Sequence, residues 1–285
     1  MSAGATATGD PTLGPVWKRA SWYAVLSALS VLVLFPIYMT IVRALSTPRD
    51  YVQRGQPLYP VAVQPDIFGR AWTQGDLGRQ MALSAVVTAI IVTAQLTTSI
   101  LSAYAFSFLQ FRGRTAMFYL FMATLMLPLE VTLIPNVDTV QSLGWFNSIQ
   151  GLTAPFLATA FGTFLIRQGF LGIPRDLRDA AALDGFGHLA FLWRVAIPIT
   201  RPVVASFGVI AFLSAWNQYL WPRAIVNEAK WNTIQIGLKN VGAANVDEMN
   251  IGVAAAIIAA LPVLALLIFL QRHLVRGLTA GAVKG

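Results

Sequence analysis

The sequence predicts an all-α membrane protein with six transmembrane helices, and two observations lead to this prediction. Apolar residues make up 56% of the 285 residues, charged residues only 11%, and the mean hydropathy is +0.64. This composition leaves too little polar surface to cover a water-soluble globule of this size. In addition, several apolar runs reach the roughly 20 residues needed to cross a bilayer. Because lipid offers no partner to open backbone groups, these runs are expected to be helical.

The chain divides into a short tail and one membrane domain. Residues 1–20 are interpreted as a flexible cytoplasmic tail, since their first part is polar and rich in glycine and proline. Residues 21–285 form the six-helix transmembrane domain. The first apolar run is too long for a signal peptide and is followed by no clean cleavage site, so it is interpreted as a span. The spans are expected at residues 22–45, 81–109, 115–134, 149–166, 201–221 and 250–270.

Charged and aromatic residues predict the orientation of the domain. Six spans place both termini on one side of the membrane. That side receives twelve of the 20 basic residues, and the longer loops opposite receive the other eight. The positive-inside rule therefore predicts cytoplasmic termini. Four tryptophans near the proposed outer surface are interpreted as an interfacial belt, namely Trp145, Trp216, Trp221 and Trp231.

The loop at residues 167–200 is long and ordered for a loop on the inner side. Pro174 suits a first helical turn, residues 175–183 are mostly good helix formers, and Gly185 ends the run. A second short helix is expected at residues 189–194, before Pro198 breaks it. Two short helices at an angle would form a projecting knob. Its three alanines permit close approach to a groove, and its charged residues can pair at the rim: Ala180, Ala181 and Ala182, with Arg178, Asp179 and Asp184.

This loop resembles the cytoplasmic signature of binding-protein-dependent ABC importer permeases. That signature reads Glu-Ala-Ala-x-x-x-Gly, then nine residues, then Ile-x-Leu-Pro. The sequence here reads Asp179-Ala180-Ala181-Ala182-Leu183-Asp184-Gly185, nine residues, then Val195-Ala196-Ile197-Pro198. The spacing matches in full, with conservative changes at residues 179, 195 and 197. Residues 125–131, 216–222 and 271–278 are similar to the carbohydrate-uptake type, and most of all to glycerol-3-phosphate permeases.

The resemblance implies a fold, a cargo and partners. The fold is that of a type I ABC importer permease in the bacterial plasma membrane, in which residues 179–182, 184, 185 and 198 couple the knob to an ATPase. The partners are a second permease subunit, forming a heterodimer, two ATPase subunits and an extracytoplasmic solute-binding protein. The cargo is sn-glycerol-3-phosphate or a glycerophosphodiester, and the alternative is a disaccharide or oligosaccharide such as maltose or trehalose.

The sequence also argues against other chemistry in this chain. It has no Gly-x-x-x-x-Gly-Lys-Ser/Thr loop to bind nucleotide phosphates, so ATP and magnesium are assigned to the partner ATPase and the chain is not expected to be an enzyme. It contains no cysteine, and its two histidines, His188 and His273, are far apart, which argues against a metal site. Basic residues occur singly at the ends of apolar runs, which disfavours nucleic acid as a partner.

Several polar or aromatic residues near the spans are candidates for the solute pathway. Glu130 is the only acidic residue within an expected span, so it either lines a pathway or caps a helix broken near Pro128. Asn217 and Gln218 could bind a polyol or phosphate, or could join helices. Trp216 and Tyr219 could stack on a sugar, although an interfacial position is the favoured interpretation. Arg43 and Arg223 could attract an anion, although their favoured role is as interfacial anchors.

Two other classes of protein remain open on the residues alone. A secondary transporter would need charged relays within the spans and usually internal repeats, and the sequence offers one glutamate and no evident repeat. A membrane scaffold that only recruits a soluble partner through the knob is compatible with the same residues.

Overall fold

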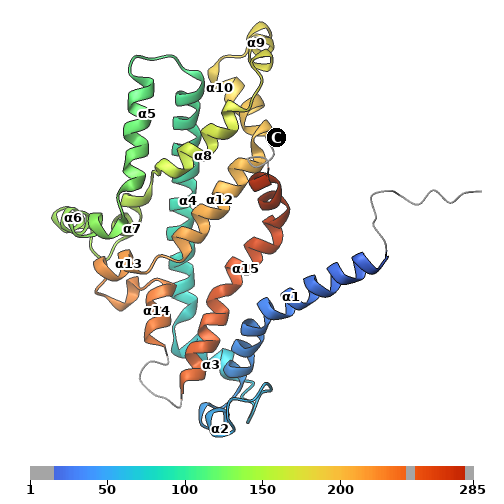
Figure 1. Cartoon of the computed structure of the whole chain (residues 1–285). Coiled ribbons are helices and arrows are strands. Elements are labelled where there is room, and N and C mark those ends of the chain that lie inside the picture. Colours follow the sequence, from blue (N-terminus) through green and yellow to red (C-terminus); the bar gives the residue numbers. More distant parts are fainter. Residues whose placement is uncertain (1–15, 242–247, 280–285) are drawn as a thin grey trace, which may run out of the picture.

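The computed structural model describes residues 16–241 and 248–279, and these residues form helices and connecting turns without a strand (Figure 1). The tail ending at residue 15 and the last residues from 280 lie outside this description. The long helices are α1 (Val16–Leu45), α4 (Leu77–Phe108), α12 (Arg201–Trp216) and α15 (Met249–Thr279). The shorter ones are α2 (Pro48–Gln53), α3 (Ile67–Gln74), α5 (Arg114–Ala123), α6 (Leu129–Ser142), α7 (Ile149–Thr153), α8 (Ala160–Leu171), α9 (Arg175–Leu183), α10 (His188–Phe191), α11 (Ile197–Ile199), α13 (Leu220–Ile225) and α14 (Ile234–Asn240).

The described helices match the predicted spans in number when two bent pairs are each counted as one. Four segments are long and apolar enough to cross a membrane, at Ala20–Leu45, Leu77–Phe108, Arg201–Ile225 and Met249–Leu270. The α5–α6 and α7–α8 pairs supply the other two. The segment between the first two spans holds two short helices, α2 and α3.

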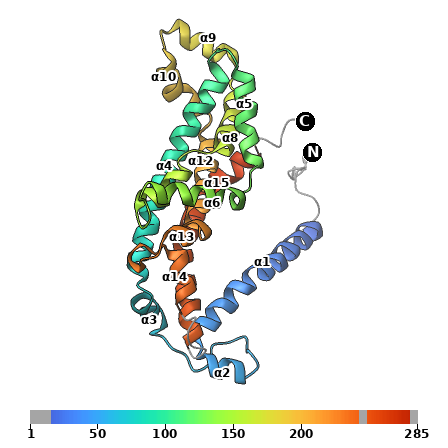
Figure 2. The same cartoon turned by 90° about the vertical axis from the view of Figure 1, so that its left-hand side faces the viewer.

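The third span, expected at residues 115–134, is broken at Pro128, as one of the two interpretations of Glu130 had it. Helix α5 and a 3₁₀ turn end at Met126, and α6 then turns away by 98°, so that it lies across the bundle (Figures 1 and 2). Proline disfavours a helical conformation in the residue before it and lacks a donor N–H. Accordingly, Leu127 is extended, with φ −84° and ψ 112°, and Pro128 is the N-cap of α6. Pro128 therefore divides this span.

The fourth span is also broken, between α7 and α8, with a bend of 46°. Its second half continues to Leu171, beyond the expected end at residue 166. The break leaves carbonyls without helical partners, which is unfavourable in lipid unless another group binds them. Helix α4 supplies these groups: Gln95 Nε2 donates to the Phe156 carbonyl at 2.9 Å, and Thr98 Oγ1 lies 3.1 Å from the Leu157 carbonyl oxygen. The break is thus stabilised by a neighbouring span.

Two of the four tryptophans assigned to the interfacial belt are instead buried between helices. Trp216 is 4% exposed, stacks on Phe212 with ring centroids 5.7 Å apart, and donates to the Ala259 carbonyl at 3.2 Å. Trp221 is 1% exposed and donates to the Gly151 carbonyl at 3.0 Å. The interfacial interpretation is therefore wrong for both residues. Hydropathy does not distinguish an indole at the lipid surface from one that joins two helices.

Helix α1 leaves the bundle at an angle and packs against it only near the end that leads into α2 (Figures 1 and 2). Only 6% of the most apolar stretch of this helix is buried. At its packed end, Ser46 donates to the Val42 carbonyl and accepts from the Val61 amide, while its own carbonyl accepts from Asn250 at 3.2 Å. These bonds join α1, the following loop and the start of α15.

Three helices pack closely at Gly162, where α8 contacts α4 and α12. A Cβ atom at this position would lie 2.2 Å from Phe207 Cζ and 2.3 Å from Ser99 Oγ. Gly208 is a matched control on α12, because a Cβ there would have only an ordinary contact of 3.7 Å with Leu96.

We expect Gly162→Ala to destabilise the protein by about 1–3 kcal/mol through overpacking. Gly208→Ala should leave the stability unchanged or raise it, since alanine favours the helix. Thermal unfolding of the two purified variants in one detergent measures the difference. Equal stability of the two variants would contradict this description of the α4–α8–α12 contact.

Candidate functional site

The predicted knob is present at one end of the molecule, where α9, α10 and the turn between them project beyond the bundle (Figure 1). We call residues 175–191 the knob. Pro174 precedes α9 as predicted, in an extended conformation. At the other end of α9, Gly185 N donates to the Ala182 carbonyl and Phe186 N donates to the Ala181 carbonyl. This pair of bonds is a Schellman motif, which requires a left-handed residue at position 185. Gly185 has φ +77° and meets that requirement.

The three alanines of the signature lie on different faces of α9. Ala181 is 7% exposed and belongs to a buried cluster with Phe108, Phe170 and Phe191. Ala180 and Ala182 are exposed, and the neighbouring Leu183 is 90% exposed. One alanine thus joins the knob to the bundle, while the other two and Leu183 present a small apolar surface. This arrangement suits insertion into a groove of another protein.

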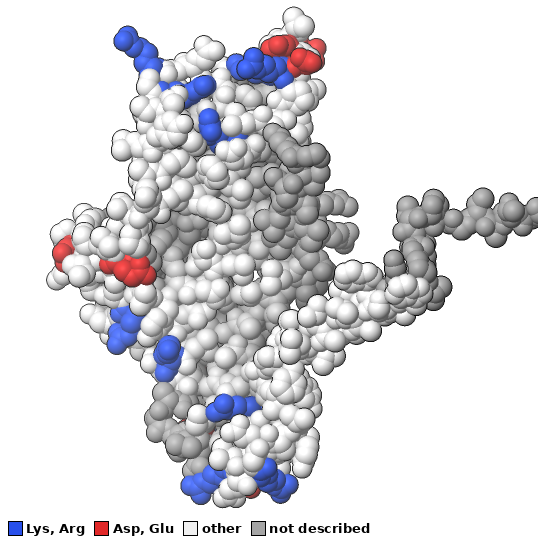
Figure 3. Space-filling model, in the orientation of Figure 1, with Lys and Arg blue, Asp and Glu red and all other residues white. Residues whose placement is uncertain are grey.

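The charged residues of the signature surround that surface. Asp179 and Asp184 are exposed, and Figure 3 shows acidic and basic side chains together at the tip of the knob. No ion pair joins them to Arg178 within the described part of the chain. The Arg178 guanidinium carbon instead lies 5.8 Å from the centre of the Phe108 ring on α4. The carboxylates therefore remain available to groups outside this chain.

The second helix of the loop differs from the prediction. Pro198 was expected to end it, but the helix runs from His188 to Ile199 through a π-helical turn at Leu192–Ala196, followed by α11. In a π turn an N–H bonds to the carbonyl five residues earlier instead of four. The turn therefore changes which carbonyl is left without a donor by the missing N–H of the proline. Pro198 is half-buried within α11 and does not lie on the exposed face of the knob.

The candidate pathway residues fall into two places. Glu130 is exposed in the first turn of α6, directly after the break at Pro128. Asn217, Gln218 and Tyr219 form the non-helical link between α12 and α13. Trp216 lies at the end of α12 with its indole in the interior. The structure therefore brings Trp216, Asn217, Gln218 and Tyr219 together and places Glu130 on another element.

The α12–α13 link contains an unusual polar group. Gln218 Oε1 is buried and has no hydrogen-bond partner in the described residues. Nearby, Gln235 Nε2 lies 3.3 Å from the Trp216 carbonyl oxygen and 3.4 Å from Asn217 Oδ1, and Lys239 Nζ lies 5.6 Å from the Tyr219 ring centre. A buried acceptor without a donor is unfavourable unless another molecule supplies one. Gln235 and Lys239 were not identified from the sequence, because they lie on α14, outside every span.

Asn147 was also missed, and it fixes the connection between α6 and α7. It adopts φ +50°, and its Oδ1 accepts from the amides of Asn227 at 2.9 Å and Glu228 at 3.2 Å. Asparagine tolerates the left-handed conformation better than most residues, which is the one sequence signal for this role. The bonds link residues 80 positions apart at the α13 end of the molecule.

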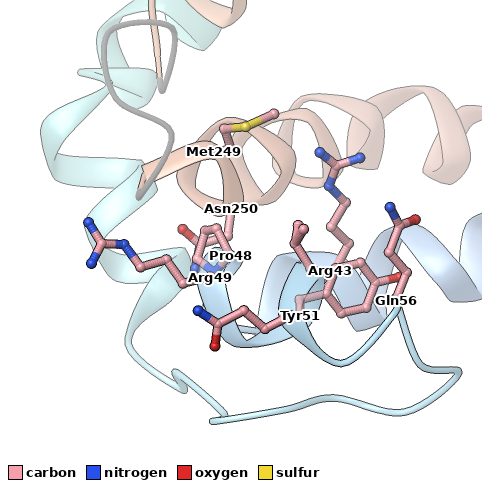
Figure 4. Close-up of a pocket in the computed structure, with 9 residues that line it drawn as sticks. Arg43, Pro48, Arg49, Tyr51, Gln56, Met249 and Asn250 are labelled. Atoms are coloured by element: carbon pink, nitrogen blue, oxygen red, sulfur yellow. The ribbon is translucent and has the colours of Figure 1, made fainter.

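A hollow at the end opposite the knob lies between α2 and the beginning of α15 (Figure 4). Its volume is about 450 Å³, and Arg43 is among the residues that line it. Figure 4 shows the Arg43 side chain extending from α1 toward α15, beside Gln56. Arg43 therefore lies at the end of its span, as an interfacial anchor would, and far along the chain from the α12–α13 link.

Comparisons with known proteins agree with this architecture. Residues 95–280 match the family described as binding-protein-dependent transport system inner membrane component. The chain is 34% identical over 258 residues to the sn-glycerol-3-phosphate transport system permease protein UgpE of Yersinia pestis bv. Antiqua (strain Antiqua), covering 87% of this chain and 91% of that protein. It is 35% identical over 261 residues to the UgpE protein of Rhizobium meliloti (strain 1021), with the same coverage.

Two solved structures share the fold. One is a bacterial ABC transporter involved in the import of the acidic polysaccharide alginate, with a TM-score of 0.77 and 22% identity over 94% of this chain and 99% of that one. The other is a bacterial alginate ABC transporter in complex with an alginate pentasaccharide-bound periplasmic protein, with a TM-score of 0.64 and 15% identity over 89% and 95%. The predicted permease fold is confirmed. The chain therefore belongs to the family of inner membrane components of binding-protein-dependent transport systems, and it is a permease subunit rather than an enzyme.

Proposed function

We propose that this permease forms half of the translocation pathway of an ATP-driven importer for sn-glycerol-3-phosphate or a glycerophosphodiester. The observation that carries the importer role is the knob, which keeps the full signature spacing and presents Ala180, Ala182 and Leu183 to solvent. The cargo rests on the relatives, since proteins 34–35% identical over 87% of the chain are named sn-glycerol-3-phosphate permeases.

The proposed partners complete the machine. A second permease subunit would supply the other half of the pathway, two ATPase subunits would receive the two knobs, and an extracytoplasmic binding protein would deliver the solute. The exposed apolar face of α1 supports a membrane partner. Only 6% of the most apolar stretch of this helix is buried, which leaves its face to lipid or to another helix. The missing nucleotide-binding loop supports a separate ATPase that binds ATP and magnesium.

The proposed orientation places the knob and both termini in the cytoplasm. Twelve of the 20 basic residues are assigned to this side, and one of them, Lys284, lies outside the described residues. In this orientation α2, α3 and the Asn147 connection face the binding protein. ATP-driven closure of the ATPases would draw the two knobs together, and α4 and α8 would transmit that movement to the outer side.

The charges near the α12–α13 link are compatible with an anionic cargo. Lys239 lies beside Tyr219, and the buried Gln218 oxygen can accept a hydrogen bond from a polyol hydroxyl. Figure 3 shows acidic side chains at the level of α6 and basic ones between that level and the end opposite the knob. An anion entering from that end would therefore be favoured along α13 and α14 rather than along α6.

Uptake by the reconstituted complex tests the cargo. We expect labelled sn-glycerol-3-phosphate to enter proteoliposomes in an ATP-dependent manner when the cognate binding protein is added. Maltose and trehalose, presented with the same binding protein, should not enter. Transport of a sugar alone would refute the cargo assignment and leave the importer role intact.

The Schellman motif yields a test of coupling. Gly185→Pro removes the donor to Ala182 and cannot adopt φ +77°, so we expect ATP hydrolysis without solute uptake while the permease remains in the membrane. Gly185→Asn should retain most coupling, because asparagine tolerates this conformation. Gly187→Ala is the matched control, since Gly187 has φ −72° and open space around it. Failure of Gly185→Pro to insert would mean that the turn is needed for folding instead.

Charge reversal at the rim gives an independent test. Asp184 is exposed and forms no ion pair within the described residues, so Asp184→Lys should leave the fold unchanged. We expect it to lower the solute uptake per ATP hydrolysed, because a lysine would oppose the partner groups that an aspartate attracts. Unchanged uptake and hydrolysis would exclude Asp184 from the ATPase contact.

A further inference from the structure

The knob is connected to the membrane helices by a single side-chain hydrogen bond among the residues whose side chains the structure describes. The Tyr104 hydroxyl on α4 lies 3.0 Å from Nδ1 of His188, the first residue of α10. The other contacts of the knob with the bundle are apolar packing around Ala181 and Phe191 and the position of Arg178 over Phe108.

We propose that Tyr104 and His188 are positioning residues that set the angle of the knob and transmit its movement to α4. This inference rests on the proposed coupling function, and it adds residues that the signature does not contain. His188 lies three positions after Gly185, between the two stretches that carry the resemblance.

A hydrogen bond fixes the relative orientation of two groups more strictly than apolar packing does. Apolar packing is not directional, so packing alone determines the angle of α9 on the bundle only weakly. A hydrogen bond weakens steeply as its angle closes, and it therefore selects one orientation. The Tyr104–His188 bond is the contact that can impose such a preference on the knob.

The Tyr104 side chain is held in place by packing within the bundle. Tyr104 is 7% exposed and lies in the last turns of α4. Its ring is 5.0 Å from the Phe108 ring and 6.4 Å from the Phe170 ring, which meets it at 85°. Aromatic neighbours on α4 and α8 thus fix the direction of the phenol hydroxyl.

His188 follows the turn between α9 and α10. That turn contains Gly185 and Gly187, both exposed and with open space around them. This turn separates α9 from α10, whereas the bond holds the beginning of α10 on α4. A push on α9 is therefore transferred to α4 at His188 rather than lost in movement of the whole knob.

The test uses variants that remove or keep the bond while preserving shape. Tyr104→Phe removes only the hydroxyl, and His188→Leu keeps side-chain volume without a polar atom. His188→Asn retains a polar atom near the position of Nδ1 and should restore the contact. Tyr119→Phe is the matched control, because Tyr119 lies on α5 and is 68% exposed.

The first measurement is the solute transported per ATP hydrolysed by the complete complex in proteoliposomes. We expect Tyr104→Phe and His188→Leu each to lower this ratio about fivefold, the effect of one lost hydrogen bond on a two-state population. The double variant should fall no further, and His188→Asn and Tyr119→Phe should resemble the natural protein. Independent, additive effects of the two substitutions would overturn the proposed link.

The second measurement does not depend on transport, so it separates failure of this proposal from failure of the proposed function. The chain has no cysteine, which permits clean spin labelling after Leu183→Cys and Met117→Cys, at side chains that are 90% and 54% exposed. In the full-length permease in nanodiscs, Tyr104→Phe should broaden the distance distribution between the labels, and Tyr119→Phe should not. An unchanged distribution in Tyr104→Phe and His188→Leu would refute the positioning role, whatever solute the complex carries.

Discussion

The need to satisfy every backbone polar group inside lipid shapes this fold more than any other constraint. Three of the membrane segments are interrupted, near Pro128, at residues 157–159 and at residues 217–219. Each interruption leaves carbonyls or amides without a helical partner. The second is stabilised by Gln95 of α4, and the third by Gln235, whose amide lies near the Trp216 carbonyl. Helix α4 is central to the bundle partly because it supplies polar groups to a neighbour that cannot complete its own bonds.

The elements that the sequence predicted well are those defined by local chemistry. Pro174 and Gly185 bound α9 as expected, because a proline at a helix start and a left-handed glycine at its end act through the adjacent residues alone. The long apolar runs of α4 and α15 also follow directly from their composition. The break near Pro128 was one of two interpretations of Glu130, but the bend between α7 and α8 was missed, because an apolar count over about 20 residues cannot reveal a change of direction within the run.

The elements that were missed depend on residues distant in sequence. Trp216 and Trp221 are interior because Ala259 and Gly151 offer carbonyls to their indoles, and no local pattern indicates those partners. Likewise, the coupling residues could be placed by their spacing, but Tyr104 lies 84 positions from His188 and was not connected with the knob. The sequence predicted which residues would contact a partner, whereas only the structure shows which side chains of the bundle the knob contacts.

The detached position of α1 affects how the subunit is made. A helix that packs on its neighbours only at the end leading into α2 gains little from the rest of the domain, so its own transfer into lipid must be favourable from the beginning. The bundle of α4, α8, α12 and α15 can then assemble without it, in a second stage driven by helix packing. Polar changes along α1 would consequently be felt during membrane insertion, whereas changes along α4 would be felt during assembly.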